Sequence, residues 1–123
     1  MKNQAYRMAM LFDFYGDLLT ERQREFYDLY YNEDLSLAEI AENYGISRQG
    51  VRDVIVRAEA AMTEIEDKTH IIRRFQQSKA PIAAINDAAD RLLQSIDRRS
   101  YNDVMLDEIA RTIKENVAKL EQE

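Results

Sequence analysis

Residues 36–57, SLAEIAENYGISRQGVRDVIVR, constrain the fold more than any other part of the chain. Ser36 followed three residues later by Glu39 is a capping box, in which each side chain satisfies a backbone N–H that the first helical turn leaves unbonded. Gly45 adopts the left-handed conformation of a helix C-terminus without steric cost, and Ser47 is a suitable N-cap for a second helix. The segment therefore predicts two short helices joined by a tight turn, which is a helix-turn-helix.

The second helix of this motif has an apolar side and a polar side. Val51, Val54 and Ile55 fall at helical spacing and predict the inward face. The second helix is the one that contacts bases in helix-turn-helix proteins, so its polar side chains are the candidate nucleic-acid-binding residues. We expect Arg48, Gln49 and Arg52 at base edges, and Ser47 and Arg57 on phosphates.

Two further helices are predicted before the motif. Apolar residues crowd one broad side of residues 5–15, which indicates a largely buried helix. Thr20 and Gln23 form a second capping box and open a helix that reaches about Tyr31. With the second helix of the motif running on to about Ile65, residues 1–66 are predicted to form one helix-turn-helix domain.

The remaining residues, 67–123, are predicted to form a C-terminal helical extension. Two interleaved sets of side chains repeat every seven residues, which is a heptad register. They are Phe75, Ile82, Ala89 and Ile96, with Ser78, Ile85 and Leu92 between them. A proline costs roughly 3 kcal/mol inside a helix but is harmless in a first turn. We therefore expect one helix to end near Ser78 and another to begin at about Lys79, with a kinked continuous helix through Pro81 as the alternative.

The last helix is expected over about residues 102–120, with one apolar stripe. A polar break at residues 98–102 predicts that this helix packs antiparallel to the helix of residues 79–97, as a helical hairpin. The surplus apolar surface of such a hairpin predicts a homodimer.

The composition agrees with an all-α fold. Three glycines and one proline in 123 residues provide few turn-forming positions. No segment shows the sustained alternation of apolar and polar residues that is typical of strands. The absence of cysteine excludes disulfides and thiolate metal sites. No window approaches the roughly 18 to 20 consecutive apolar residues of a membrane span, so no membrane insertion is expected and a cytoplasmic location is predicted.

Residues 19–62 resemble the promoter-contacting fourth region of bacterial sigma factors, with an EIA-type helix, a GIS-type turn and a reader helix. In those proteins the turn is followed by a Thr-Arg-Glu-Arg type run. Arg48 matches its first arginine and Arg52 an arginine one turn later, whereas Gln49 and Gly50 depart from it. The fold class implied is all-α, a sigma-region-4-like helix-turn-helix domain followed by a helical extension.

Nearly the whole chain is similar to the YlxM-like family, small bacterial helix-turn-helix proteins thought to accompany the signal recognition particle. The resemblance rests on MLFDFYGDLLTERQ, SLAEIAE, GISRQGV and the helical tail. It implies the RNA or protein of that particle as possible partners, beside DNA.

The charge distribution keeps two functions open. The net charge is −6, and residues 1–66 carry 7 Lys or Arg against 13 Asp or Glu. An acidic domain lacks the phosphate attraction that supplies most sequence-independent affinity for DNA. The first function is a nucleic-acid-binding regulator of the signal recognition particle pathway. The second is a non-enzymatic adaptor that docks a protein or ribonucleoprotein and binds DNA little.

No residue pattern in the sequence indicates catalytic chemistry. The single histidine, His70, has Glu66 and Asp67 one helical turn before it, and a surface ion pair explains this grouping better than a catalytic dyad or a metal site. The glycines stand apart, without a phosphate-binding Gly-Lys-Ser or Gly-Lys-Thr run. We expect no catalytic residue, no metal and no cofactor, and the chain is predicted not to be an enzyme.

Overall fold

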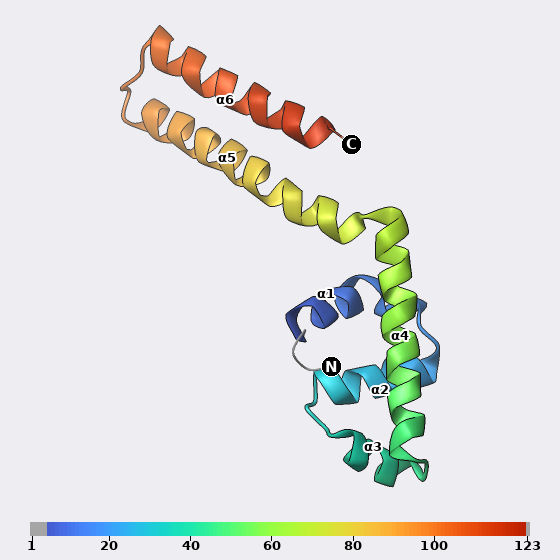
Figure 1. Cartoon of the computed structure of the whole chain (residues 1–123). Coiled ribbons are helices and arrows are strands. Elements are labelled where there is room, and N and C mark those ends of the chain that lie inside the picture. Colours follow the sequence, from blue (N-terminus) through green and yellow to red (C-terminus); the bar gives the residue numbers. More distant parts are fainter. Residues whose placement is uncertain (1–4, 123) are drawn as a thin grey trace. The chain divides into compact units, whose positions relative to one another are not determined.

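The computed structural model describes residues 5–122, which contain six α-helices, one 3-10 helix and no strand. This confirms the all-α prediction. The elements are α1 (Ala5–Tyr15), η2 (Gly16–Leu18), α2 (Glu21–Tyr31), α3 (Leu37–Tyr44), α4 (Arg48–Thr69), α5 (Ile71–Asp97) and α6 (Asp103–Glu121). They form two compact units, of which the first runs up to Ile72 and the second begins at Arg73 (Figure 1).

The first unit is built around α4, which contacts α1, α2 and α3 (Figure 1). Its core draws large apolar and aromatic side chains from all four helices. The fully covered ones are Phe26, Tyr27, Ile40, Val51, Ile55 and Met62, each 0 % exposed. Burying a side chain of this size stabilises the folded state by about 1.5–3 kcal/mol, so this core fixes the position of α4.

The local signals of the helix-turn-helix form as predicted. The Ser36 hydroxyl accepts the Glu39 N–H at 3.0 Å, and the Glu39 carboxylate accepts the Ser36 N–H at 3.2 Å. Thr20 and Gln23 form the other capping box in the same way. Gly45 ends α3 at φ 68°, in the left-handed region, and the Ser47 hydroxyl accepts the Gly50 N–H at 2.9 Å to begin α4.

The boundary between α4 and α5 lies at His70, so the prediction of a helix end near Ser78 is wrong. His70 has φ 54° and donates its N–H to the Glu66 carbonyl at 2.8 Å, which closes α4. The Glu66 carboxylate then accepts the Ile72 N–H at 2.9 Å, in the first turn of α5. Neither signal is a glycine or a conventional cap, which is why the sequence pattern did not indicate this boundary.

Helix α5 is continuous through Pro81, which confirms the continuity of the alternative prediction. Pro81 is itself buried, and the side chains that turn away from solvent with it keep one register on both sides of the proline. These are Ser78, Ile85, Ala88, Leu92 and Ser95, spaced three or four residues apart. Packing along this stripe offsets the roughly 3 kcal/mol that an interior proline costs.

The heptad prediction is correct for only one of its two sets of residues. Ile85 and Leu92 are half-buried, whereas Ile82 and Ile96 are each 54 % exposed. The physical reason is that a helix in a two-helix hairpin has one neighbour and can cover only one side of a broad apolar surface.

Helix α6 returns beside α5 as a hairpin (Figure 1). The polar turn between them includes Arg99 at φ 51°, and Asn102 caps α6 by accepting the Met105 N–H at 2.9 Å. Ile109 and Asn116 are the buried positions of α6, and the Asn116 amide donates to the Thr112 carbonyl at 2.8 Å. The predicted break at residues 98–102 and the helix after it are both confirmed.

Candidate nucleic-acid interface

The first turns of α4 form a rigid platform with one covered side. Val51 and Ile55 are fully buried against the core, and Ile40 and Ala41 of α3 are buried next to them in the same cluster. Because the inner side of α4 is fixed, the direction of its outer side chains is fixed as well.

Three of the candidate side chains share one exposed surface of α4. Arg48, Gln49 and Arg52 are all exposed. Successive residues of an α-helix are rotated by about 100°, so Gln49 lies about 100° from Arg48, and Arg52 lies one turn after Arg48 at about 40°. We call these three residues the reader surface. They present two guanidinium groups and an amide, the groups that pair with guanine and adenine edges.

Arg57 and Ser47 lie apart from the reader surface. Arg57 is exposed but follows Arg48 by nine residues, so it lies about 180° around α4 from Arg48 and about 80° from Gln49. Ser47 is exposed at the start of the helix, with its hydroxyl oxygen occupied by the Gly50 N–H. These two positions flank the reader surface and do not extend it.

An acidic neighbour restrains the amide of the reader surface. Gln49 Nε2 donates to Asp53 Oδ1 at 2.9 Å, one turn along the helix. The amide nitrogen must exchange this partner before it can donate to a base. Asp53 is exposed and also adds a negative charge to the surface that would approach phosphates.

Gly50 is explained by the cap of its own helix. A Cβ at this position would lie 3.1 Å from the Ser47 hydroxyl oxygen and 3.8 Å from Cδ1 of Ile46. Glycine therefore leaves room for the capping hydroxyl. This accounts for the glycine without a close approach by the backbone of a bound partner.

Tyrosine hydroxyls bond to carboxylates of neighbouring helices in the first unit. Tyr31 of α2 donates to Glu59 of α4 at 2.5 Å, and Tyr44 of α3 donates to Glu25 of α2. Burial, followed by the bond to Glu59, raises the pKa of Tyr31, and the bond to Glu25 is the main cause of the raised pKa of Tyr44. These contacts tie neighbouring helices together around the motif.

The sequence did not reveal these pairs. The partners lie 28 residues apart for Tyr31 and Glu59, and 19 apart for Tyr44 and Glu25. No helical periodicity links such positions, so only the tertiary structure identifies them.

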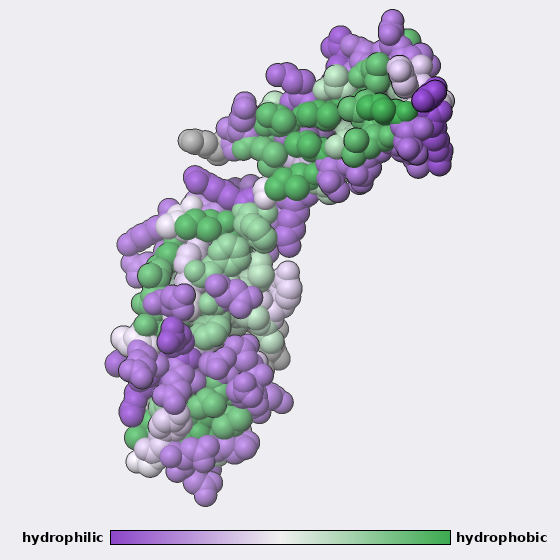
Figure 2. Space-filling model, turned by 180° about the vertical axis from the view of Figure 1, so that it is seen from behind, coloured by the Kyte–Doolittle hydropathy of each residue, from purple (hydrophilic) through white to green (hydrophobic). Residues whose placement is uncertain are grey.

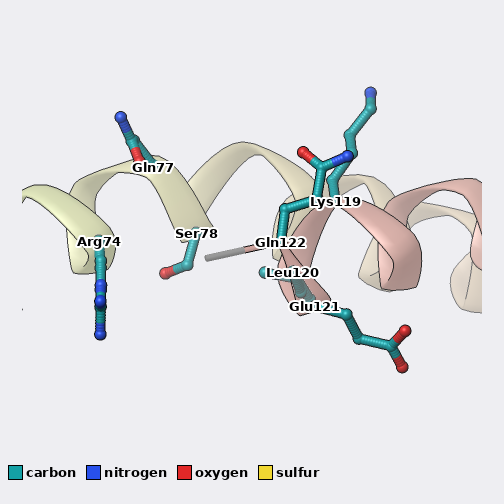
Figure 3. Close-up of a pocket in the computed structure, with 7 residues that line it drawn as sticks. All are labelled: Arg74, Gln77, Ser78, Lys119, Leu120, Glu121 and Gln122. Atoms are coloured by element: carbon teal, nitrogen blue, oxygen red, sulfur yellow. The ribbon is translucent and has the colours of Figure 1, made fainter.

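A pocket of about 260 Å³ at the open end of the hairpin has mixed chemistry. It is lined by Arg74, Gln77 and Ser78 of α5 and by residues 119–122. Figure 3 shows the Arg74 and Lys119 side chains pointing in opposite directions. The two cations do not converge on one point, so the pocket is not arranged as an anion site.

Within residues 5–122 no group of three or more His, Cys, Asp or Glu side chains is placed to hold a metal ion. Among the helices of that same range, none combines the length and the apolar character that a bilayer crossing requires.

Comparison with known proteins gives a consistent result. Residues 2–102 match the UPF0122 family, described as "Putative helix-turn-helix protein, YlxM / p13 like". The chain is 41% identical over 106 residues to a UPF0122 protein of Halalkalibacterium halodurans, covering 79% of this chain and 97% of that one. It is 47% identical over 94 residues to a UPF0122 protein of Symbiobacterium thermophilum, covering 76% and 88%. For a UPF0122 protein of Desulforamulus reducens the values are 49% over 82 residues, 66% and 70%.

Proposed function

The chain belongs to the UPF0122 family of YlxM/p13-like helix-turn-helix proteins, and we propose that it is a nucleic-acid-binding regulatory protein that contacts its target with α4. The observation that carries this proposal is the reader surface. Arg48, Gln49 and Arg52 are exposed on a helix whose inner side, at Val51 and Ile55, is fully buried. A fixed helix with a small set of exposed base-pairing groups fits the major groove of a duplex.

Some of these residues would contact bases and others the phosphate backbone of the nucleic acid. Arg48 and Arg52 would each donate two hydrogen bonds to a guanine edge, and Gln49 would pair with adenine once it leaves Asp53. A helix lying in a groove has a phosphate backbone on either side of it. Arg57, about half a turn of rotation away from Arg48, is therefore suited to a phosphate, as is Ser47 at the helix start.

The setting we propose is cytoplasmic and connected with the signal recognition particle, because the family resemblance points there. Both DNA and the RNA of that particle are ligands to test. A homodimer is part of the same proposal, since helix-turn-helix proteins commonly present two reader helices to two half-sites.

A second function is supported by a different surface of the first unit. A groove of about 440 Å³ is lined by Asp17, Glu21, Arg24, Glu25 and Asp28, together with Phe12 and Gly16. Four carboxylates against one guanidinium favour a basic partner over a phosphate backbone. This groove supports the adaptor alternative, in which the chain docks a protein or ribonucleoprotein.

Fluorescence anisotropy distinguishes the two functions. Labelled signal-recognition-particle RNA and a random DNA duplex are titrated with the full chain, with Arg48→Ala plus Arg52→Ala, and with Arg91→Ala plus Arg98→Ala. The last variant removes the same charge from the other unit, where both arginines are exposed. We expect binding to one nucleic acid, lost in the first variant and retained in the second.

Equal loss in both double variants would show that only net charge matters and would contradict a reader surface. No binding of the wild type to either nucleic acid would favour the adaptor. In that case Glu21→Gln plus Asp28→Asn is the variant expected to lose the partner.

A further inference from the structure

Helix α5 carries a second apolar stripe that α6 does not cover. Its main members are Ile82, Leu93 and Ile96, which are 54 %, 65 % and 54 % exposed. Ala89 lies between them and is half-buried. Figure 2 shows hydrophobic side chains gathered along the hairpin and bordered by hydrophilic ones. We call Ile82, Ala89, Leu93 and Ile96 the outer stripe.

The outer stripe has the spacing of a helix-packing seam. Positions 82, 86, 89, 93 and 96 alternate in steps of four and three residues, which keeps them on one side of the helix. Asn86 is the one polar member. Ala89 stands at the middle of the series, where a small side chain allows close approach of another helix.

The hairpin has little core of its own. Among residues 73–122 the buried side chains are Pro81, Ala88, Ile109 and Asn116. One alanine, one proline, one isoleucine and an asparagine bury little apolar surface for two helices of 27 and 19 residues. The stripe therefore provides the apolar surface that a stable helical bundle would cover.

The charges of the hairpin are separated along its length. The open half, residues 73–85 and 110–122, carries six Lys or Arg against two Asp or Glu, a net of +4. The turn half, residues 86–109, carries three against six, a net of −3. In an antiparallel pair of copies, the positive open half of each hairpin would lie against the negative turn half of the other. In a parallel pair, halves of the same charge would face each other.

We propose that the outer stripe binds the outer stripe of a second copy of this chain, antiparallel, so that two hairpins form a four-helix bundle. With Ala89 at the two-fold axis, Ile82 faces the partner's Ile96. Lys79 and Asp97 lie on the same flank of the stripe, so Lys79 comes near the partner's Asp97. Lys79 is held at that edge by the Phe75 ring, whose centroid lies 5.1 Å from its Nζ.

The dimer would also constrain the target. An isologous pair has two-fold symmetry, so a DNA site for two reader surfaces would be an inverted repeat. This consequence rests on the proposed function, but the dimer itself does not, and it can be tested without nucleic acid.

Sedimentation equilibrium of the full chain tests the interface. We expect twice the chain mass of 14.4 kDa for the wild type. Ile82→Asp plus Ile96→Asp should raise the dimer Kd about a hundredfold or more, because charged side chains replace two of the large apolar members of the seam, which face each other across the dimer. Leu18→Asp, at a 68 % exposed apolar position of the other unit, is the matched control and should leave the dimer intact. Circular dichroism checks that each variant stays helical.

Charge exchange tests the orientation. Lys79→Glu alone should weaken the dimer, and adding Asp97→Lys should restore it, because the antiparallel pair is then rebuilt with reversed signs. A monomeric wild type, or a dimer that withstands the two aspartates, would overturn the interface. If the variant with both charge changes dimerises no more tightly than Lys79→Glu alone, the antiparallel arrangement is overturned.

Discussion

The Tyr15 hydroxyl donates a hydrogen bond to the Glu66 carboxylate at 2.5 Å, which joins α1 to the end of α4. The same carboxylate oxygen accepts the Ile72 N–H, and the Tyr15 oxygen lies 3.1 Å from the Thr69 hydroxyl. Glu66 thus connects the first helix of the unit with the last turn of α4 and the first turn of α5. The position of the α4–α5 boundary follows from this carboxylate.

Replacing Tyr15 with phenylalanine should lower the free energy of unfolding by roughly 1–2 kcal/mol. The ring stays buried, but the hydroxyl that bonds to a charged group is lost. Urea unfolding followed by circular dichroism measures the change. Tyr6→Phe, at a 73 % exposed position, is the control and should change little. Equal stability of Tyr15→Phe and wild type would show that the bond to Glu66 does not hold the boundary.

The buried tyrosines should make the first unit sensitive to alkaline pH. Burial raises the pKa of Tyr15, Tyr27 and Tyr31 above the ordinary value of 10.0. Below pH 10 their contribution to stability is fully present. As the pH rises above 10 the unfolded chain releases these protons first, so stability falls toward the raised folded pKa. Tyrosinate absorbance should therefore appear at higher pH in the native chain than in urea, and coincident titration curves would contradict the burial of these hydroxyls.

Gly45→Ala should destabilise the first unit by about 1 kcal/mol. No atom lies within 4 Å of an added Cβ, so the cost is the left-handed backbone at φ 68° and not a clash. Gly45→Asn should cost less, because asparagine tolerates that conformation better. Thermal melting of the two variants gives the comparison, and an alanine variant as stable as the asparagine variant would argue against a backbone origin.

Pro81→Ala should stabilise the hairpin by roughly 1–2 kcal/mol. Alanine restores an N–H to the middle of a continuous helix, which is worth up to about 3 kcal/mol, and loses part of the packing of the buried ring. Helicity and melting temperature should both rise. A lower melting temperature would mean that the ring contributes more to the contact with α6 than it costs α5.

Local signals in the sequence predicted most of the first unit. The Ser36 and Thr20 capping boxes, Gly45 and Ser47 act within a few residues of themselves, so their outcome did not depend on the rest of the fold. The α4–α5 boundary depended on Glu66 reaching Ile72 and on a left-handed histidine, for which the pattern gave no cue. The proline was the stronger local signal, and it was misleading because the register of α5 continues through it.

In the candidate site too, local features could be predicted from the sequence and tertiary contacts could not. Helical periodicity predicted that Arg48, Gln49 and Arg52 would be exposed, and they are. The bond from Gln49 to Asp53 joins residues four apart and was open to prediction from spacing alone. The tyrosine–carboxylate pairs that connect the helices around the motif could not be predicted from spacing, because the two residues of each pair come together only through tertiary packing.

The salt dependence of DNA binding tests the role of the reader surface most directly. Each DNA phosphate that the protein neutralises releases condensed counterions into solution, which adds about 0.9 to the steepness of log K against log salt concentration on duplex DNA. If Arg48 and Arg52 lie in the groove between the two phosphate backbones, their charges help to neutralise neighbouring phosphates, so the slope of Arg48→Ala plus Arg52→Ala should be shallower than that of the wild type by up to about 2 units. Parallel lines for the two proteins would show that these arginines do not meet the nucleic acid.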